Sequence, residues 1–397
     1  MVRWLHISDL HIVRRADWIN FEKELIKKCR EYDKIDLVIV TGDFHNFSEG
    51  DNFCLARDFL QKLLGNLELD IERDLFIVPG NHDGVSSVLT KNFFIRSAKN
   101  NPFEDTEQWV EGLLVAFEGY ENFVRDLIPH YPVEHPASVH NRTWRNRINF
   151  IHCNTALAAD GKEKENQLLD VDALAETAYV SDMPNILLAH NSFFDLHQKH
   201  QQRVKDTIRA NSICAYFCGD WHKQEIYEIP LGRVNVPCVV SYRSAPDPQD
   251  DHSSFGIILG EWEGDLAELR GWCWKSGQGF IEDPKITGKS FPMRVEYVQQ
   301  PTSHPDAPNI EESPSKTSVG AKCLDPQIEE YTLKHLFITN YYQLTRQQCT
   351  LFNQKHGDMP LALEVDSKRL SDYVNAAQER GILPDLVQDL FRVLASD

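Results

Sequence analysis

The chain has 397 residues, of which 42% are hydrophobic and 25% are charged, and its formal net charge is −19. This balance is typical of a globular protein with one large domain and room for a small one. The negative charge opposes a broad, non-specific grip on nucleic acid, because lysine and arginine supply that affinity by neutralising phosphates. No apolar run approaches the ~18–20 residues of a membrane span and no signal-peptide pattern opens the chain, so we expect a cytoplasmic protein without membrane association.

Short apolar runs alternate with helical patterns in the first part of the chain. Residues 3–8, 36–41 and 74–79 are rich in branched and aromatic side chains and are predicted strands. The amphipathic segments 17–32 and 52–66 lie between them and are predicted helices. This βαβαβ order predicts an α/β fold that begins with a parallel sheet.

Further strands are predicted along the middle of the chain. Long helices are not evident between the later ones, so we expect a second sheet of more antiparallel or mixed character. The predicted ranges are 148–153, 185–190, 213–219, 236–242, 254–262 and 266–274.

The nine cysteines are scattered, and several lie in apolar runs, which favours free thiols in a reducing compartment. Cys214 and Cys218 are four residues apart on a predicted strand, which places them on one face. A zinc site is disfavoured there, because no second pair of ligands is nearby in the sequence.

The C-terminal part of the chain has a different composition. Residues 296–326 are rich in proline, serine and charge without an apolar period, which predicts a flexible linker between a main domain at 1–295 and a smaller one. Residues 327–397 contain four helical patterns, for which we expect a small all-α bundle.

Polar side chains follow five predicted strands at the point where each strand ends. Open α/β sheets place ligand sites at the carboxyl ends of their strands, and the glycines allow sharp turns there. Any one of these groups alone is ordinary turn chemistry, but the five together indicate a metal centre. They are Asp9 with His11, Gly42-Asp43, Gly80-Asn81-His82-Asp83, His190, and Gly219-Asp220 with His222.

This ordered set resembles the signature of the calcineurin-like metallophosphoesterases, over roughly residues 1–275. The resemblance implies a four-layer α/β/β/α sandwich, two divalent metal ions and hydrolysis of phosphoester bonds. Manganese is the expected metal, with iron or zinc as alternatives, because imidazole ligands suit transition metals better than magnesium. Two such cations screen an anionic phosphodiester, activate a bound water and hold the reacting oxygens in line.

The resemblance also implies a role for each position. Asp9, His11 and His222 resemble the ligands of the first metal, and Asn81 and His190 resemble ligands of the second. Asp43 resembles the carboxylate that bridges both ions. His82 resembles the residue that protonates the leaving group; the alternative is a spectator that orders Asn81, with Asp83 orienting it.

One position departs from the family pattern. The family usually has Gly-His-x-His where this chain has Gly219-Asp220-Trp221-His222. Asp220 either binds the second metal through an oxygen or only orients His190. A carboxylate in place of an imidazole adds negative charge, which favours manganese. Four other side chains near strand ends are expected to support the site at most; they are His6, Ser8, His45, for which Asn46 is an alternative, and His152.

Residues 330–397 carry a second resemblance, to the effector-associated or death-like adaptor domains of bacterial conflict systems. It implies that this segment recruits a protein partner, whereas a generic capping or self-associating bundle is the alternative. Three functions are open: a nuclease effector of antiviral defence, a hydrolase of small (cyclic) nucleotides or phosphoproteins, and a non-enzymatic platform. The nuclease reading has three candidate basic segments, each also explained as a solvated face: Arg14–Arg15, Arg142 with Arg145 and Arg147, and Arg203 with Lys205 and Arg209.

Overall fold

The computed structural model describes residues 1–12, 15–32, 34–45, 53–84, 106–159, 167–177, 182–222, 225–232, 234–244, 255–275 and 278–294. The predicted linker at 296–326 and the predicted helical bundle at 327–397 lie outside the described residues. Within the described part, no helix is both long enough and apolar enough to cross a membrane.

The first sheet has seven strands in the order β12-β11-β10-β1-β2-β3, with β13 paired to β11. β1, β2 and β3 run parallel, as the βαβαβ pattern predicts. β10 pairs antiparallel with β1. The strands are β1 (Val2–Ile7), β2 (Leu37–Thr41), β3 (Leu75–Val78), β10 (Gly256–Glu263), β11 (Leu266–Lys275), β12 (Gly279–Asp283) and β13 (Lys289–Pro292).

The prediction that all later strands form a second sheet is wrong for two of them. β10 and β11, predicted at 254–262 and 266–274, return to the first sheet. β10 covers the free edge of β1, and Trp4 lies opposite Gly260, where a Cβ atom would stand 2.0 Å from the indole Cε2. The glycine therefore makes room for Trp4 at this long-range pairing.

The second sheet has six strands in the order β4-β5-β6-β7-β9-β8. Its four inner strands are parallel, and β4 and β8 pair antiparallel at the two edges, so the sheet is mixed, as expected. The strands are β4 (His140–Trp144), β5 (Ile148–His152), β6 (Asn185–Leu188), β7 (Ile213–Cys218), β8 (Glu225–Pro230) and β9 (Asn235–Val240).

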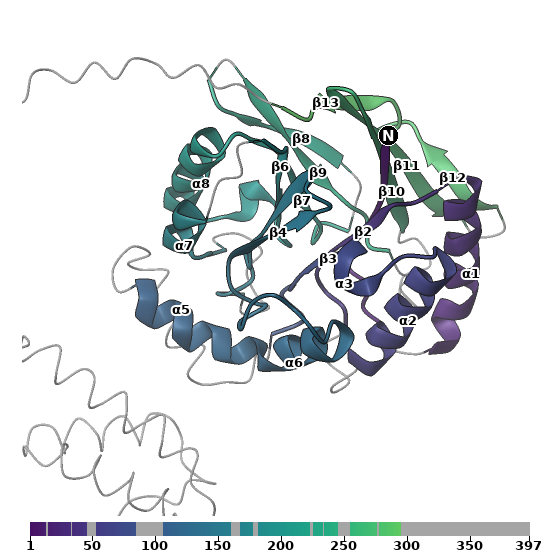
Figure 1. Ribbon diagram of the computed structural model, residues 1–397, viewed down its shortest axis with the longest axis horizontal. Helices are drawn as coiled ribbons and strands as arrows, with labels where there is room; N and C mark the ends of the chain where they lie inside the picture. Colours follow the sequence, from purple (N-terminus) through teal and green to yellow (C-terminus); the bar gives the residue numbers. More distant parts are fainter. Residues whose placement is uncertain are drawn as a thin grey trace, which may run out of the picture. The chain divides into compact units, whose positions relative to one another are not determined.

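Three hydrophobic clusters define the layers. One lies between the first sheet and a group of helices, the second lies between the two sheets, and the third lies between the second sheet and α7 and α8. Helices therefore cover the outer faces of two stacked sheets, as Figure 1 shows for α1 and α2 on one side and α7 and α8 on the other. The helices are α1 (Arg15–Glu31), α2 (Phe53–Asn66), α3 (Ile71–Asp74), α5 (Thr106–Leu114), α6 (Glu118–Leu127), α7 (Val171–Glu176) and α8 (Gln198–Ala210).

The amphipathic pattern explains how α1 packs. Phe21, Leu25 and Cys29 recur at steps of four residues, and all three are buried in the cluster against the first sheet. Residues at this spacing share one face of a helix, so a single apolar stripe is enough to dock α1.

β7 contains an irregularity that changes which face its residues occupy. Asn185 pairs with Ile213 but Ile186 pairs with Ala215, so Cys214 is an extra residue in the ladder. Such a bulge shifts the alternation of side chains by one. Cys214 consequently lies in the cluster between the sheets and Cys218 in the cluster under the helices. The prediction that these two cysteines share a face is wrong for this reason.

Candidate metal centre

The five strand ends that carry polar residues meet at one edge of the stacked sheets. Within the first sheet, the loop after β1 is bonded to the loop after β2: Asp9 N donates to Gly42 O at 3.0 Å and His11 N to Asp43 O at 2.9 Å. Within the second sheet, the loops after β6 and β7 are joined in the same way, by a bond of 2.9 Å from Gly219 N to His190 O. Backbone bonds therefore fix the polar side chains of adjacent strands beside one another.

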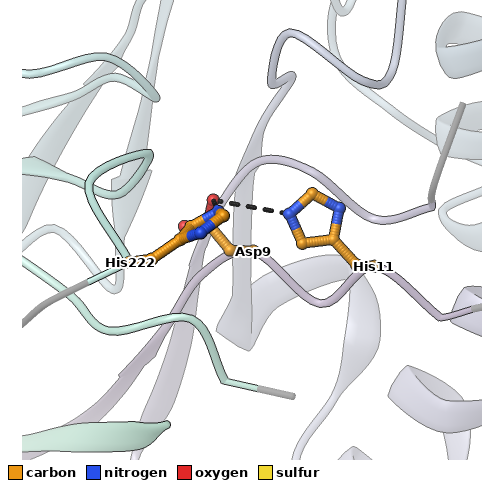
Figure 2. A group of neighbouring side chains, drawn as sticks. All are labelled: Asp9, His11 and His222. Atoms are coloured by element: carbon orange, nitrogen blue, oxygen red, sulfur yellow. Dashed lines mark ion pairs between the residues drawn. The ribbon is translucent and has the colours of Figure 1, made fainter. Parts of the chain in front are cut away.

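Asp9, His11 and His222 form the first group of side chains (Figure 2). Asp9 Oδ1 lies 3.4 Å from His222 Nε2 and 3.8 Å from His11 Nε2. Asp9 is fully buried, whereas 43% of the His222 side chain is exposed. The group thus has a buried carboxylate at its base and an imidazole at its open side.

Asp43 lies at the middle of the site. Its Oδ2 atom is 3.5 Å from His11 Nε2, 3.4 Å from His190 Nε2 and 4.0 Å from His82 Nε2. Hydrogen bonds between nitrogen and oxygen are shorter, about 2.7–3.2 Å. Two ligand atoms that share one ion at about 2.1 Å lie about 3.0–3.4 Å apart, which is close to the distances from Asp43 to His11 and His190.

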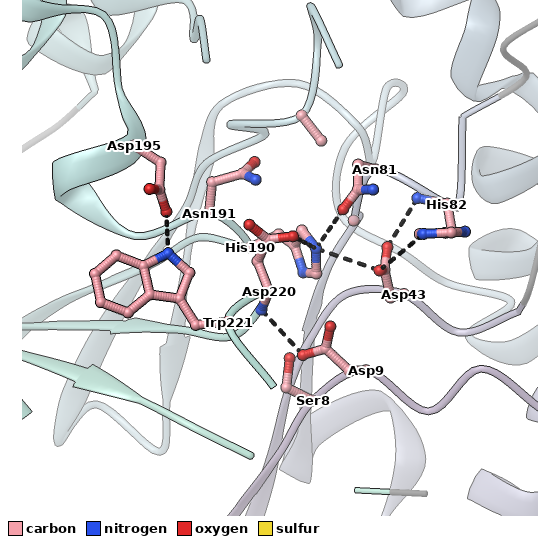
Figure 3. A network of polar contacts seen from close by, with 12 residues as sticks. Ser8, Asp9, Asp43, Asn81, His82, His190, Asn191, Asp195, Asp220 and Trp221 are labelled. Carbon is pink, nitrogen blue, oxygen red and sulfur yellow. Dashed lines mark hydrogen bonds and ion pairs between the residues drawn. The ribbon is translucent and has the colours of Figure 1, made fainter. Parts of the chain in front are cut away.

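His190, Asn81 and Asp220 form the second group (Figure 3). His190 Nε2 lies 2.8 Å from Asn81 Oδ1 and 3.6 Å from Asp220 Oδ1. On the other side of the ring, His190 Nδ1 donates to the carbonyl of Thr41 at 2.7 Å. A carbonyl only accepts, so Nδ1 carries a proton, and Nε2 is the ring nitrogen that points at the oxygen of Asn81.

Two lone pairs that face each other require a cation between them. Burial would lower the pKa of His190, but the neighbouring carboxylates, Asp43 foremost, raise it well above 6.5. The second proton of the imidazole or a metal ion satisfies Nε2 and the Asn81 oxygen equally. The Nδ1 bond to Thr41 leaves Nε2 as the ring atom available to a metal ion, an arrangement that is usual for histidine ligands with an ordered partner.

Several buried atoms in the site have no hydrogen-bond partner among the described residues. Asp9 Oδ1, His11 Nε2 and Asp220 Oδ2 are each shielded from solvent and unpaired. Burial lowers the pKa of His11 to about 4, although Asp43 and Asp9 oppose the shift, so the ring is neutral and its nitrogen can bind a metal. Unpaired buried donors and acceptors are costly, and these three fit the ligand shell of divalent cations.

Several candidate ligands have a strained backbone conformation with positive φ. Nine described residues other than glycine have positive φ, and the candidate ligands account for five of them. Such conformations cost about 1–3 kcal/mol each and persist where the surroundings impose them, often at functional sites. The φ angles are 51° for Asp9, 42° for His11, 56° for Asp43, 66° for Asp220 and 52° for His222.

The glycines at the strand ends mainly allow neighbouring groups to lie close to the backbone. Gly42 has a φ of +90°, as the turn argument expects. At Gly80 a Cβ atom would lie 2.2 Å from Asp43 Oδ1, and at Gly219 it would lie 1.8 Å from Ser8 Oγ. Side chains at these two positions would displace Asp43 and Asp9, which explains glycine there better than backbone freedom does.

Asp83 has a different role from the one predicted. Its carboxylate accepts bonds from the backbone N–H groups of Asp43 and Phe44, both at 2.8 Å, and of Gly80 at 2.7 Å. Burial and the adjacent Asp43 raise the pKa of Asp83 to about 7, although the three donors favour its ionised form. Asp83 therefore ties the loops after β2 and β3 together rather than orienting the His82 ring.

Two supporting residues carry no sequence signal and were not predicted. The Thr41 carbonyl accepts from His190 Nδ1 and also from Ser8 Oγ at 2.9 Å. Thr155 Oγ1 accepts from the backbone of His190 at 3.3 Å and of Asn191 at 2.9 Å. Thr41 holds His190 through its backbone carbonyl, which any residue type possesses, whereas Thr155 does so through its side-chain hydroxyl. Among the residues expected to support the site, His6 bonds Thr41 Oγ1 at 3.0 Å.

The arginines of two predicted basic segments are largely engaged within the protein. Arg142 is buried, and its guanidinium donates to the carbonyls of Leu75 and Glu72. These arginines therefore add little free positive charge for a phosphate backbone. Further ion pairs join Arg145 to Asp74 at 3.5 Å, Arg203 to Asp172 at 2.6 Å and Arg209 to Asp206 at 3.0 Å.

Comparisons with known proteins give one family and distant structural likenesses. The family model described as calcineurin-like phosphoesterase matches residues 2–224. A crystal structure of Vps29 from Entamoeba histolytica complexed with Zn²⁺ is 10% identical, with a TM-score of 0.33, and the match covers 71% of this chain and 99% of that one. A structure of GAP50 from Plasmodium is 9% identical, with a TM-score of 0.37 and coverages of 74% and 90%.

A structure of PhoD is 12% identical, with a TM-score of 0.44, and 72% of each chain is covered. A search of curated proteins found no match. The region that matches the family model spans more than half of the chain and contains every candidate ligand, from Asp9 to His222. The chain belongs to the calcineurin-like phosphoesterase family of metal-dependent hydrolases.

Proposed function

We propose that the protein hydrolyses phosphodiester bonds with two divalent metal ions, manganese being the expected metal and iron or zinc the alternatives. The observation that carries this proposal is the position of Asp43, whose Oδ2 lies 3.5 Å from His11 Nε2 and 3.4 Å from His190 Nε2. A single carboxylate between two imidazoles from different sheets is suited to bridging two ions. Carboxylate and imidazole ligands together favour manganese, iron or zinc over magnesium.

Each ion has a proposed set of ligands. Asp9, His11 and His222 hold the first, Asn81, His190 and Asp220 hold the second, and Asp43 is shared. When bound, the two ions screen the phosphate, lower the pKa of a bound water and hold the attacking and leaving oxygens in line. Asp220 is included because its Oδ2 atom is buried and unpaired while Oδ1 lies 3.6 Å from His190.

His82 is proposed to protonate the departing oxygen. Its backbone N–H donates to Asp43 Oδ1 at 2.8 Å, which fixes the residue beside the proposed bridge. Its side chain is 35% exposed, with Nε2 4.0 Å from Asp43 Oδ2, so the ring lies on the open side of the site where a leaving group departs. General acids at this position typically contribute about 10²–10⁴-fold in rate.

A nucleic acid strand is the proposed substrate, with the protein acting as a nuclease effector of bacterial antiviral defence. The adaptor-like sequence of residues 327–397 supports this reading, as a segment that recruits a protein partner or self-associates. A second candidate is a hydrolase of small (cyclic) nucleotides or phosphoproteins. The burial of Arg142 and the pairing of Arg203 and Arg209 with surface carboxylates favour it, because a long polyanion needs free cations.

A substrate panel separates these functions. The Mn²⁺-loaded protein is incubated with single- and double-stranded DNA and RNA, cyclic nucleotides, phosphopeptides and bis(p-nitrophenyl) phosphate, with Asp43→Asn as the control for contaminating enzymes. Cleavage of a polymer supports the nuclease. Hydrolysis of small substrates alone supports the second candidate. A metal-loaded protein that hydrolyses none of them contradicts the proposed enzyme and favours an interaction platform.

A further inference from the structure

The loop between β7 and β8 presents two proposed metal ligands in an unfavourable backbone conformation. Asp220 and His222 have φ angles of 66° and 52°, and Trp221 lies between them. A bond of 2.8 Å from Trp221 N to Gly219 O tightens the turn. Left-handed residues other than glycine keep this conformation only where neighbouring groups impose it, so the contacts of the loop determine where both side chains point.

Among the described residues of this loop, Trp221 makes side-chain contacts with two other segments. Its indole Nε1 donates to the carboxylate of Asp195, as Figure 3 shows, and the ring packs edge-on against Tyr227 at 5.0 Å between centroids. In that view the indole extends to the side of Asp220 away from Asp43. The Trp221 side chain therefore holds the loop on the side away from Asp43, whereas the adjacent Asp220 and His222 lie toward the proposed metals.

Asp195 is itself fixed and buried. It ends a short 3-10 turn, Phe193–Asp195, which begins three residues after His190, and only 7% of it is exposed. Its backbone N–H donates to Ser192 O at 3.0 Å, and its carbonyl accepts from Gln167 N at 2.9 Å. A bond from an N–H group to a buried carboxylate is stronger and more directional than one between neutral groups.

We infer that Asp195 and Trp221 are a positioning pair that locks the loop bearing Asp220 and His222 to the loop bearing His190. The inference rests on the proposed two-metal function. The pair contacts neither metal in this assignment, and it acts on both ions at once, since His222 belongs to the first set of ligands and Asp220 and His190 to the second. Side chains that orient metal ligands typically change metal affinity by about 10–100-fold when removed.

The experiment compares metal affinity in matched variants of the full chain. Trp221→Phe removes the indole N–H but keeps a ring against Tyr227. Trp262→Phe is the control, because Trp262 Nε1 also donates a bond, to Gly264 O at 2.7 Å, on β10 of the other sheet. Mn²⁺ is titrated into chelator-treated protein and free Mn²⁺ is followed by electron paramagnetic resonance; turnover of bis(p-nitrophenyl) phosphate is measured at limiting and saturating Mn²⁺.

We expect Trp221→Phe to weaken Mn²⁺ binding about 10–100-fold and to recover most of its kcat at saturating Mn²⁺, while Trp262→Phe binds as the wild type does. Asp195→Asn is the second variant, in case Trp221→Phe does not fold, and the double variant should lose less affinity than the sum of the single losses. If the metal-free variants have lower thermal stability but unchanged Mn²⁺ affinity, the positioning role is overturned and the proposed function is not. A wild-type protein that binds none of Mn²⁺, Fe²⁺ and Zn²⁺ overturns the proposed function as well.

Discussion

This protein has two groups of buried histidines, and the two groups differ in the sign of the charge beside the rings. In the metal centre, His11 and His190 lie within 3.5 Å of an Asp43 oxygen. In the second group, at the edge formed by β4 and β5, His140 stacks on His152 with 4.5 Å between ring centroids, and the neighbouring charge is Arg142. A carboxylate beside a buried imidazole allows the two groups to share a metal ion, whereas an arginine beside it does not.

In the second group, His140 has both ring nitrogens hydrogen-bonded. His140 Nδ1 donates to Ser138 O at 2.9 Å, and its Nε2 accepts from the Tyr131 hydroxyl at 2.9 Å. Burial lowers the pKa of His140 to about 4, and burial with the nearby His140 and Arg142 lowers the pKa of His152 well below 6.5. These rings are neutral and His140 has both nitrogens in use. Both nitrogens of His152 lack a hydrogen-bond partner among the described residues, as His11 Nε2 does, but the charge beside His152 is the Arg142 cation, whereas Asp43 and Asp9 lie beside His11.

The largest expected effect comes from removing the central charge of the metal centre. Asp43→Asn should lower turnover by at least about 10³-fold and reduce the Mn²⁺ content, because the proposed bridge loses its charge and one of its ligand oxygens. Turnover and metal content per chain are measured on the same sample. Asp172→Asn, which removes a carboxylate paired with Arg203 at the surface, is the matched control and should leave both unchanged. Full metal content with full activity in Asp43→Asn would refute the bridge.

Removing the proposed general acid should have a smaller and substrate-dependent effect. His82→Gln should slow hydrolysis about 10²–10⁴-fold for diesters with alkoxide leaving groups, and much less for p-nitrophenyl esters, whose leaving group needs no proton. Rates for both substrate types are compared at saturating Mn²⁺. An equal loss on both types would show that His82 acts on metal or phosphate binding instead.

A change at the proposed ligand Asp220 should affect one metal site more than the other. Asp220→Asn should weaken the second Mn²⁺ site about 10–100-fold while the first stays filled, since Asp9, His11 and His222 are untouched. Stepwise titration of metal-free protein with Mn²⁺ distinguishes the two sites. Asp220→His, which restores the family pattern, should keep two ions per chain. Two undisturbed Mn²⁺ sites in Asp220→Asn would mean that Asp220 only orients His190.

The smallest expected effect concerns the second group of histidines. As the pH falls below 6.5, the unfolded chain takes up a proton at His140 before the folded protein does, so stability is complete above pH 6.5 and is lost toward pH 4. The loss attributable to His140 is about 3 kcal/mol. His140→Phe cannot titrate and should show a shallower fall in unfolding free energy between pH 6.5 and 4, measured by urea denaturation with chelator present. An unchanged slope would contradict this account.

Much of the fold follows from local sequence, and the residues of the site follow from one topological rule. The strands ending before Asp9, Asp43 and Asn81 are apolar runs, and their parallel pairing brings their carboxyl ends to one edge. β4 and β8 escaped prediction because they are edge strands with polar, partly exposed residues. Their pattern does not differ from that of a loop.

The errors have identifiable physical causes. Cys214 is a bulge residue, and a bulge depends on how β7 meets β6, which no periodicity within β7 can show. The roles of Asp83 and Thr41 depend on backbone groups, which leave no pattern in the sequence. The return of β10 to β1 is a pairing between residues more than 250 positions apart, such as Val2 and Trp262, which local signals do not specify.

The pairing of β10 with β1 also bears on how the chain reaches its native state. The matched family region stops at residue 224, yet the strand beside β1 is Gly256–Glu263. During synthesis one edge of β1 stays unpaired until this distant strand leaves the ribosome. Contacts between residues so far apart in the sequence make folding slow. A fragment that ends at residue 224 contains every proposed ligand, but it lacks the strand that completes the sheet on which Asp9 is carried. The segment that holds the proposed site residues is therefore shorter than the segment that completes their sheet.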